Sequence, residues 1–179
     1  MKNARVLIVE YDAALSTALS ATLQLRLDKL RVDTCDSAFV ALEKVSATDF
    51  DAIVADINMP GMDGLDLLDR IRQLQPDTPT LLITGHGEHE LAIRALRGGA
   101  HDYVQKPIDR DYFVGSLRHA IEVHQLSRNL ARQRQALERQ ARELRECPRP
   151  GREHWRGSVG PQSRGAPGPL RRRYGSGHC

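Results

Sequence analysis

Short apolar runs alternate with amphipathic segments through the first 122 residues, and this alternation constrains the fold more than any other feature. The run at residues 6–9 is short and continuous, as expected of a strand buried on both faces, and the run at residues 30–35 is weaker. The intervening segments repeat apolar residues every three or four positions, as one-sided helices do. The predicted strands are residues 6–9, 30–35, 52–55, 80–83 and 102–105, and a fifth helix is expected to begin near Arg110. We therefore predict an α/β fold in which a five-stranded parallel sheet is doubly wound with helices on both faces.

Polar residues stand at the ends of four of the predicted strands. Glu10 and Asp12 follow the first strand, Asp56 ends the third, Thr84 ends the fourth and Lys106 follows the fifth. An aspartate after a strand is often only a turn or capping residue, but the carboxyl ends of parallel strands share one crevice, where ligands bind. Phosphoryl transfer to a carboxylate needs a nucleophile, a divalent cation and positive groups that follow the moving charge. This set favours such chemistry, with Asp56 as the nucleophile.

Four segments resemble the signature blocks of response-regulator receiver domains. They are residues 6–12, the run Asp-Ile-Asn-Met-Pro-Gly-Met-Asp-Gly at 56–64, Ile-Thr-Gly at 83–85 and Tyr-Val-Gln-Lys-Pro at 103–107. The resemblance covers roughly residues 4–122 and implies a flavodoxin-like (βα)5 fold. It implies that Asp56 is the phosphoacceptor and that the backbone carbonyl of Asn58 is a Mg²⁺ ligand. It also implies that Thr84 bonds a phosphoryl oxygen, that Lys106 pairs with Asp56 or its phosphate, and that Tyr103 swings inward upon activation.

The sequence departs from this family at one metal-binding position. The first strand of the family ends in two acids, and here Glu10 occupies the first place, Tyr11 the second, and Asp12 comes one residue late. A neutral phenol is a poor ligand for a hard cation. Three interpretations follow: Asp12 reaches the metal by local rearrangement; Mg²⁺ binds weakly through Asp56, the Asn58 carbonyl and a water-bridged Glu10; or the domain signals without phosphate. We favour weak binding of Mg²⁺ over signalling without phosphate.

The resemblance implies a switch that takes a phosphoryl group from a sensor histidine kinase or a phosphotransfer protein, and that is not a turnover enzyme. The alternative function is that of a phosphate-independent interaction module with the same fold. A third class, the aspartyl-phosphate phosphatases of the haloacid-dehalogenase type, is disfavoured. Those enzymes carry a second acid two residues after the nucleophile, where this chain has Asn58.

Beyond the predicted receiver domain, residues 1–122, the fifth helix is expected to continue as an extension over residues 123–146, which contain no glycine or proline. An apolar residue recurs at every seventh position, namely at Val123, Leu130, Leu137 and Leu144. The positions four residues after the first three hold Ser127, Arg134 and Ala141, which disfavours a strong independent coiled coil. We predict an extension that forms a homodimer or relays the signal.

The last 33 residues have an unlike composition. Residues 147–179 hold seven glycines, five prolines, seven arginines and one acid, so we expect a disordered tail. Of the 26 basic and 23 acidic residues, 19 and 22 remain in residues 1–146, and this mild acidity gives no reason to expect direct DNA binding. The chain lacks a signal peptide and an apolar run long enough to span a membrane, and its three cysteines lie far apart. We therefore expect a cytoplasmic protein with reduced thiols and no membrane contact.

Overall fold

The computed structural model describes residues 3–85 and 87–146, with side chains through residue 145. The chain divides into two compact units, residues 1–140 and 141–179, and the whole sheet lies in the first unit. The disorder predicted for residues 147–179 lies outside the described residues, and the predicted boundary at residue 122 stays a prediction. Within the described part, each helix is too short or too polar to cross a bilayer.

Five parallel strands form one sheet in the order β2-β1-β3-β4-β5. The strands are β1 (Ala4–Val9), β2 (Leu30–Cys35), β3 (Ala52–Asp56), β4 (Thr80–Thr84) and β5 (Asp102–Gln105). The helices are α1 (Ala13–Arg26), α2 (Ala38–Ala47), α3 (Gly64–Leu74), α4 (His89–Arg97) and α5 (Arg110–Glu146). The predicted doubly wound α/β fold and the extended fifth helix are confirmed.

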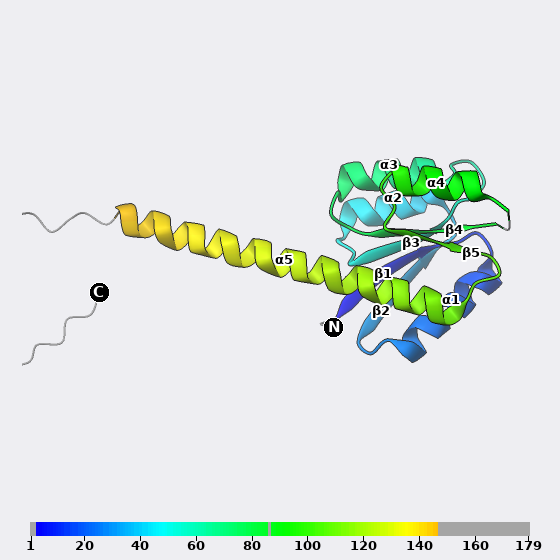
Figure 1. Cartoon of the computed structure of the whole chain (residues 1–179), viewed down its shortest axis with the longest axis horizontal. Helices are drawn as coiled ribbons and strands as arrows, with labels where there is room; N and C mark the ends of the chain where they lie inside the picture. Colours follow the sequence, from blue (N-terminus) through cyan, green and yellow to red (C-terminus); the bar gives the residue numbers. More distant parts are fainter. Residues whose placement is uncertain (1–2, 86, 147–179) are drawn as a thin grey trace, which may run out of the picture. The chain divides into compact units, whose positions relative to one another are not determined.

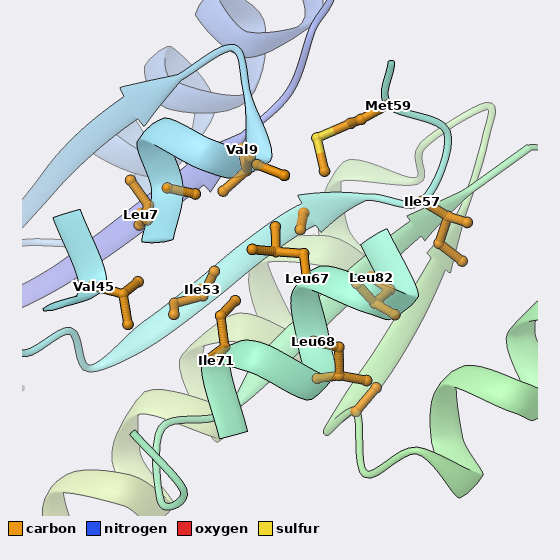
Figure 2. Packing of buried hydrophobic residues seen from close by; sticks show 14 of the residues in the cluster. Leu7, Val9, Val45, Ile53, Ile57, Met59, Leu67, Leu68, Ile71 and Leu82 are labelled. Atoms are coloured by element: carbon orange, nitrogen blue, oxygen red, sulfur yellow. The ribbon is translucent and has the colours of Figure 1, made fainter. Parts of the chain in front are cut away.

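The helices cover both faces of the sheet (Figure 1), and α1 and α5 pack on one face while α2, α3 and α4 pack on the other. Successive residues of a strand point to opposite faces. Leu7 and Ile53 therefore join the cluster under α2 and α3, seen in Figure 2, whereas Ile8 and Val54 join the cluster under α1 and α5. Because all four side chains are fully buried, the strands read as continuous apolar runs in the sequence.

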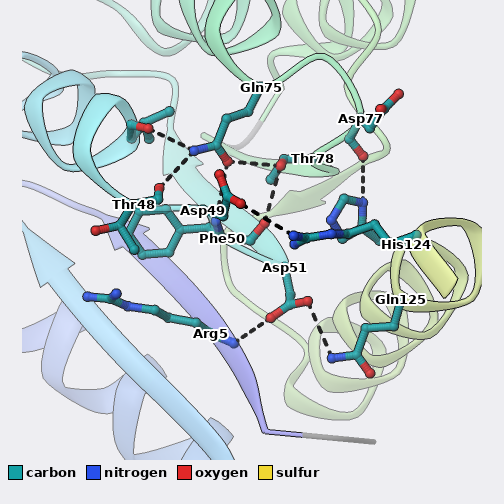
Figure 3. A network of polar contacts seen from close by, with 12 residues as sticks. Arg5, Thr48, Asp49, Phe50, Asp51, Gln75, Asp77, Thr78, His124 and Gln125 are labelled. Atoms are coloured by element: carbon teal, nitrogen blue, oxygen red, sulfur yellow. Dashed lines mark hydrogen bonds and ion pairs between the residues drawn. The ribbon is translucent and has the colours of Figure 1, made fainter. Parts of the chain in front are cut away.

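Polar contacts at the amino ends of the strands fix α5 to the loops beneath the sheet (Figure 3). The Nδ1 of His124 lies 2.7 Å from the carbonyl oxygen of Asp77, and the side-chain amide of Gln125 donates to the carboxylate of Asp51 at 3.3 Å. His124 is buried, so its ring is part of the packing between α5 and the loop that precedes β4. These contacts hold α5 at the end of the sheet opposite Asp56.

Candidate functional site

Glu10, Asp56 and Lys106 meet at the carboxyl end of the sheet. Asp56 is the last residue of β3, Glu10 directly follows β1, and Lys106 directly follows β5. The Nζ of Lys106 donates to Oδ2 of Asp56 at 2.7 Å and lies 3.5 Å from Oε2 of Glu10. Only 4% of Asp56 and 2% of Glu10 is exposed, so two carboxylates that water barely reaches share one ammonium group.

The electrostatics of this cluster follow from burial. Burial raises the pKa of Glu10 and the charge of Asp56 adds to the rise, although the backbone amide of Asp12 and the ammonium of Lys106 oppose it. Desolvation alone would lower the pKa of Lys106, but its hydrogen bond to Asp56 and its charge interactions with Asp56 and Glu10 outweigh that cost and raise the pKa. Lys106 is therefore held in its charged form, as a partner for Asp56 must be.

The loop after β3 is shaped tightly around Asp56. The backbone N–H of Asn58 donates to Oδ1 of Asp56 at 3.3 Å, so each carboxylate oxygen has a donor. The backbone of Gly64, at the start of α3, passes so close that an added Cβ would lie 2.5 Å from the carbonyl oxygen of Asp56. Gly64 thus allows the close contact between α3 and the end of β3.

Neither Tyr11 nor Asp12 joins the cluster of Glu10, Asp56 and Lys106, because Tyr11 is exposed and Asp12 caps α1. Tyr11 is 64% exposed, so its ring does not seal the buried Asp56. The carboxylate of Asp12 caps α1 by accepting the backbone N–H groups of Ala14 at 2.9 Å and Leu15 at 3.2 Å. A ligand role for Asp12 would require it to leave this cap, and that role stays a prediction.

Thr84 and Tyr103 lie on the neighbouring strands. Thr84 is buried at the end of β4, and its carbonyl oxygen accepts the N–H of Lys106 at 2.8 Å. Tyr103 is half-buried on β5, directly opposite Leu82 of β4. The strand ends therefore bring Thr84 to the mouth that holds Asp56, whereas Tyr103 lies further back along β5.

Sequence reasoning missed Glu88, which joins two loops at this mouth. Its Oε1 accepts the side-chain amide of Asn58 at 3.0 Å, and its Oε2 accepts the backbone N–H of Gly85 at 2.6 Å. The available signal was an acid at the start of α4, only four residues after Thr84. Glu88 directly precedes α4, yet its side chain makes no capping hydrogen bond.

The donor set fits a Mg²⁺ ion held by few protein groups. Oε2 of Glu10 is buried and accepts no hydrogen bond, and its charged neighbour is Nζ of Lys106 at 3.5 Å, so it can serve as an oxygen ligand beside Asp56. Mg²⁺ commonly uses one or two carboxylates and keeps several waters. Glu10, Asp56 and the carbonyl of Asn58 would hold it. Among the described residues, no group of three or more acidic, histidine or cysteine side chains could do so.

Comparison with known proteins identifies the family of the chain. A sequence model of the response regulator receiver domain matches residues 6–118. The chain belongs to this family, and it is a receiver domain of two-component signalling.

Among curated relatives, the chain is 42% identical over 123 residues to the C4-dicarboxylate transport transcriptional regulatory protein DctD of Pseudomonas aeruginosa, covering 68% of this chain and 26% of that protein. It is 42% identical over 119 residues to the response regulator protein FleR of the same organism, covering 66% of this chain and 25% of FleR. The chain thus spans about a quarter of the length of these relatives.

Solved structures agree on the fold. A putative response regulator from Chloroflexus aurantiacus is 29% identical with a TM-score of 0.63, covering 68% of this chain and 99% of that one. NtrX from Brucella abortus in complex with ATP is also 29% identical, with a TM-score of 0.66, covering 72% of this chain and 29% of that one.

Proposed function

We propose that this receiver domain accepts a phosphoryl group on Asp56 from a histidine kinase or a phosphotransfer protein. The observation that carries the proposal is the buried Asp56 carboxylate, which Lys106 holds at 2.7 Å at the carboxyl end of the sheet. An oriented carboxylate with a fixed cation beside it has the geometry that a phosphoryl acceptor needs. The domain acts as a switch and not as a turnover enzyme.

In the proposed transfer, a carboxylate oxygen of Asp56 forms a bond to phosphorus as the bond from the donor imidazole nitrogen breaks. The electron pair of the broken bond stays on the imidazole, which takes up one proton and leaves as neutral histidine. The ammonium of Lys106 follows the charge that develops on the phosphoryl oxygens, and the hydroxyl of Thr84 supplies a further donor from β4. Bound Mg²⁺ would neutralise phosphoryl oxygen charge during this step.

We propose that Mg²⁺ binds weakly. Glu10 and Asp56 supply two carboxylates, while the position of the usual second acid holds the exposed, neutral Tyr11. The nearest substitute, Asp12, is engaged as the cap of α1. Affinity for a hard cation falls as carboxylates are lost from its site. Mg²⁺ concentration is therefore expected to limit phosphorylation.

A groove between α1 and the start of α5 is the proposed contact for the phosphoryl donor. Its volume is about 260 Å³, and its lining includes Leu15, Ala18 and Phe113 together with Lys106. Because Lys106 forms part of this groove, a protein seated there would have its phosphohistidine close to Asp56. An apolar groove beside a charged site is the arrangement that specific docking uses.

We propose that the signal passes through the Thr84 and Tyr103 face and that α5 pairs with α5 of a second copy. Exposed apolar side chains recur along α5 within the first unit, at Val123, Leu126, Leu130 and Leu137. Such a series favours contact with another helix. The DctD and FleR relatives are regulators about four times the length of the matched region, and direct DNA binding by residues 1–146 is not proposed.

Incubation with acetyl phosphate and Mg²⁺, followed by intact-protein mass measurement, tests the proposal. The wild-type protein is expected to gain one phosphoryl group, with acetate leaving, and Asp56→Asn is expected to gain none. Asp63→Asn, which alters the cap of α3 without touching the cluster, is the matched control and should still be labelled. A wild-type protein without label at high Mg²⁺ would contradict the proposal and leave the phosphate-independent interaction module.

A further inference from the structure

The carboxylate of Glu88 bridges the two loops that flank Asp56. One oxygen accepts the side-chain amide of Asn58 from the β3–α3 loop at 3.0 Å. The other accepts the backbone N–H of Gly85 from the β4–α4 loop at 2.6 Å. Hydrogen bonds to a charged acceptor are stronger than those between neutral groups, so this bridge holds the two loops together.

The local sequence favours this bridge over the usual use of an acid at a helix start. Glu88 precedes α4, where its side chain would ordinarily cap the free N–H groups of the first turn, but it makes no such bond. Gly85 makes room for it, because a Cβ at this position would lie 3.0 Å from Oε2 of Glu88. The carboxylate therefore lies across the mouth of the site instead of on its own helix.

We propose that Glu88 is a positioning residue that occupies the Gly85 N–H in the unphosphorylated domain and must release it when Asp56 is phosphorylated. This inference rests on the proposed function. A phosphoryl group on Asp56 adds about one further negative charge and three acceptor oxygens, which need donors. The Gly85 N–H follows Thr84 at the end of the strand next to Asp56, so it is a donor that the new group would recruit.

Charge repulsion acts in the same direction as this competition. A dianionic phosphoryl group would face the Glu88 carboxylate across the side chain of Asn58, whose backbone N–H also contacts Asp56. Loss of the Glu88 bridge would free the residue directly before α4. Phosphorylation of Asp56 would thereby loosen the start of α4, and the bridge would stabilise the unphosphorylated state.

Three variants separate the bridge from the charge of Glu88. Glu88→Ala removes both, while Gly85→Ala keeps the charge and pushes the carboxylate away from the N–H. Glu90→Ala is the matched control, because Glu90 is an exposed acid in the first turn of the same helix. The measurement is the rate of labelling by acetyl phosphate at fixed Mg²⁺ and subsaturating donor, with folding of each variant checked by circular dichroism.

If the bridge opposes phosphorylation, Glu88→Ala and Gly85→Ala are labelled roughly ten to a hundred times faster than wild type, as expected for loss of a hydrogen bond to a charged group. Glu90→Ala keeps the wild-type rate. Rates for Glu88→Ala and Gly85→Ala that equal or fall below the wild-type rate overturn the inference, and labelled wild-type protein then shows that the proposed function stands. A wild-type protein that takes no label overturns both.

NMR spectroscopy of the wild-type protein tests the same inference without requiring that any variant be phosphorylated. The side-chain amide resonances of Asn58 report its bond to Glu88, and Glu88→Ala supplies their positions without that bond. Beryllofluoride, a phosphoryl mimic, is added with Mg²⁺, and Mg²⁺ alone is the reference. The resonances are expected to move toward the Glu88→Ala positions only with beryllofluoride. Resonances that stay at the Mg²⁺ reference positions overturn the inference.

Discussion

Replacing Lys106 with methionine tests whether the buried carboxylates depend on one ammonium group. The substitution keeps an unbranched side chain one atom shorter but removes the charge that lies 2.7 Å from Asp56 and 3.5 Å from Glu10. Two unit charges at the shorter distance attract by about 6 kcal/mol at an effective dielectric constant of about 20. Removing one partner of a buried pair typically costs about 3–5 kcal/mol, because the other charge is left uncompensated.

The Lys106 side chain is 33% exposed, so water screens part of this interaction. We therefore expect Lys106→Met to lower the free energy of unfolding by about 2 kcal/mol at neutral pH without Mg²⁺. For a compact unit of this size the corresponding fall in Tm is roughly 7 °C. Urea unfolding followed by circular dichroism measures the loss directly.

Lys44→Met is the matched control, since Lys44 lies on α2 and the described part of the chain shows no salt bridge for it. Its unfolding free energy should stay within about 0.5 kcal/mol of wild type. In an Asp56→Asn background, Lys106→Met should cost at most half as much as in the wild type. A loss below about 0.5 kcal/mol, or an equal loss in both backgrounds, would refute the proposed dependence.

Three further predictions concern the site and its surroundings. Glu10→Gln should flatten the pH dependence of stability. Burial raises the pKa of Glu10, so the folded state binds this proton more tightly and wild-type stability rises as the pH falls from neutrality toward the ordinary pKa of 4.5. Urea titrations at several pH values measure this rise, and an equal dependence of stability on pH in wild type and variant would contradict it. Gly64→Ala should lower the free energy of unfolding by about 3 kcal/mol, because its Cβ would meet the backbone of Asp56. Gly115→Ala, with open space around its Cβ in α5, should raise that free energy by about 0.5–1 kcal/mol. Similar changes for both variants in thermal unfolding would contradict this packing. Tyr11→Asp should tighten Mg²⁺ binding about tenfold in calorimetry, and unchanged affinity would show that this position does not limit the metal.

The fold was largely predictable because the inner strands β3 and β4 are buried along their whole length. Their apolar runs, at residues 52–55 and 80–83, can be recognised as strands from the sequence alone. The strands β3 and β4 end one residue beyond these runs, at Asp56 and Thr84. Helix positions were less informative about burial. Phe39 belongs to the apolar pattern of α2 but is exposed, because smaller side chains on the same helix face the sheet.

The site was predictable only where topology decides it. Strand ends bring Asp56 and Lys106 together in any sheet of this order, and the structure joins them by a hydrogen bond. The role of Asp12 was open because a cap and a metal ligand both use a carboxylate oxygen, and the structure shows the cap. The bridge made by Glu88 depends on the approach of two loops to each other, which no spacing along the chain encodes.

The most direct measurement locates the phosphoryl group itself. Protein labelled by a phosphorylated histidine kinase or by acetyl phosphate is treated with borohydride, which reduces an aspartyl phosphate to homoserine, and is then digested and sequenced by mass spectrometry. The account predicts homoserine at position 56 and nowhere else, in an amount that increases with Mg²⁺ concentration. Homoserine at another acidic residue, or an unmodified Asp56 in protein that carries phosphate, would contradict it.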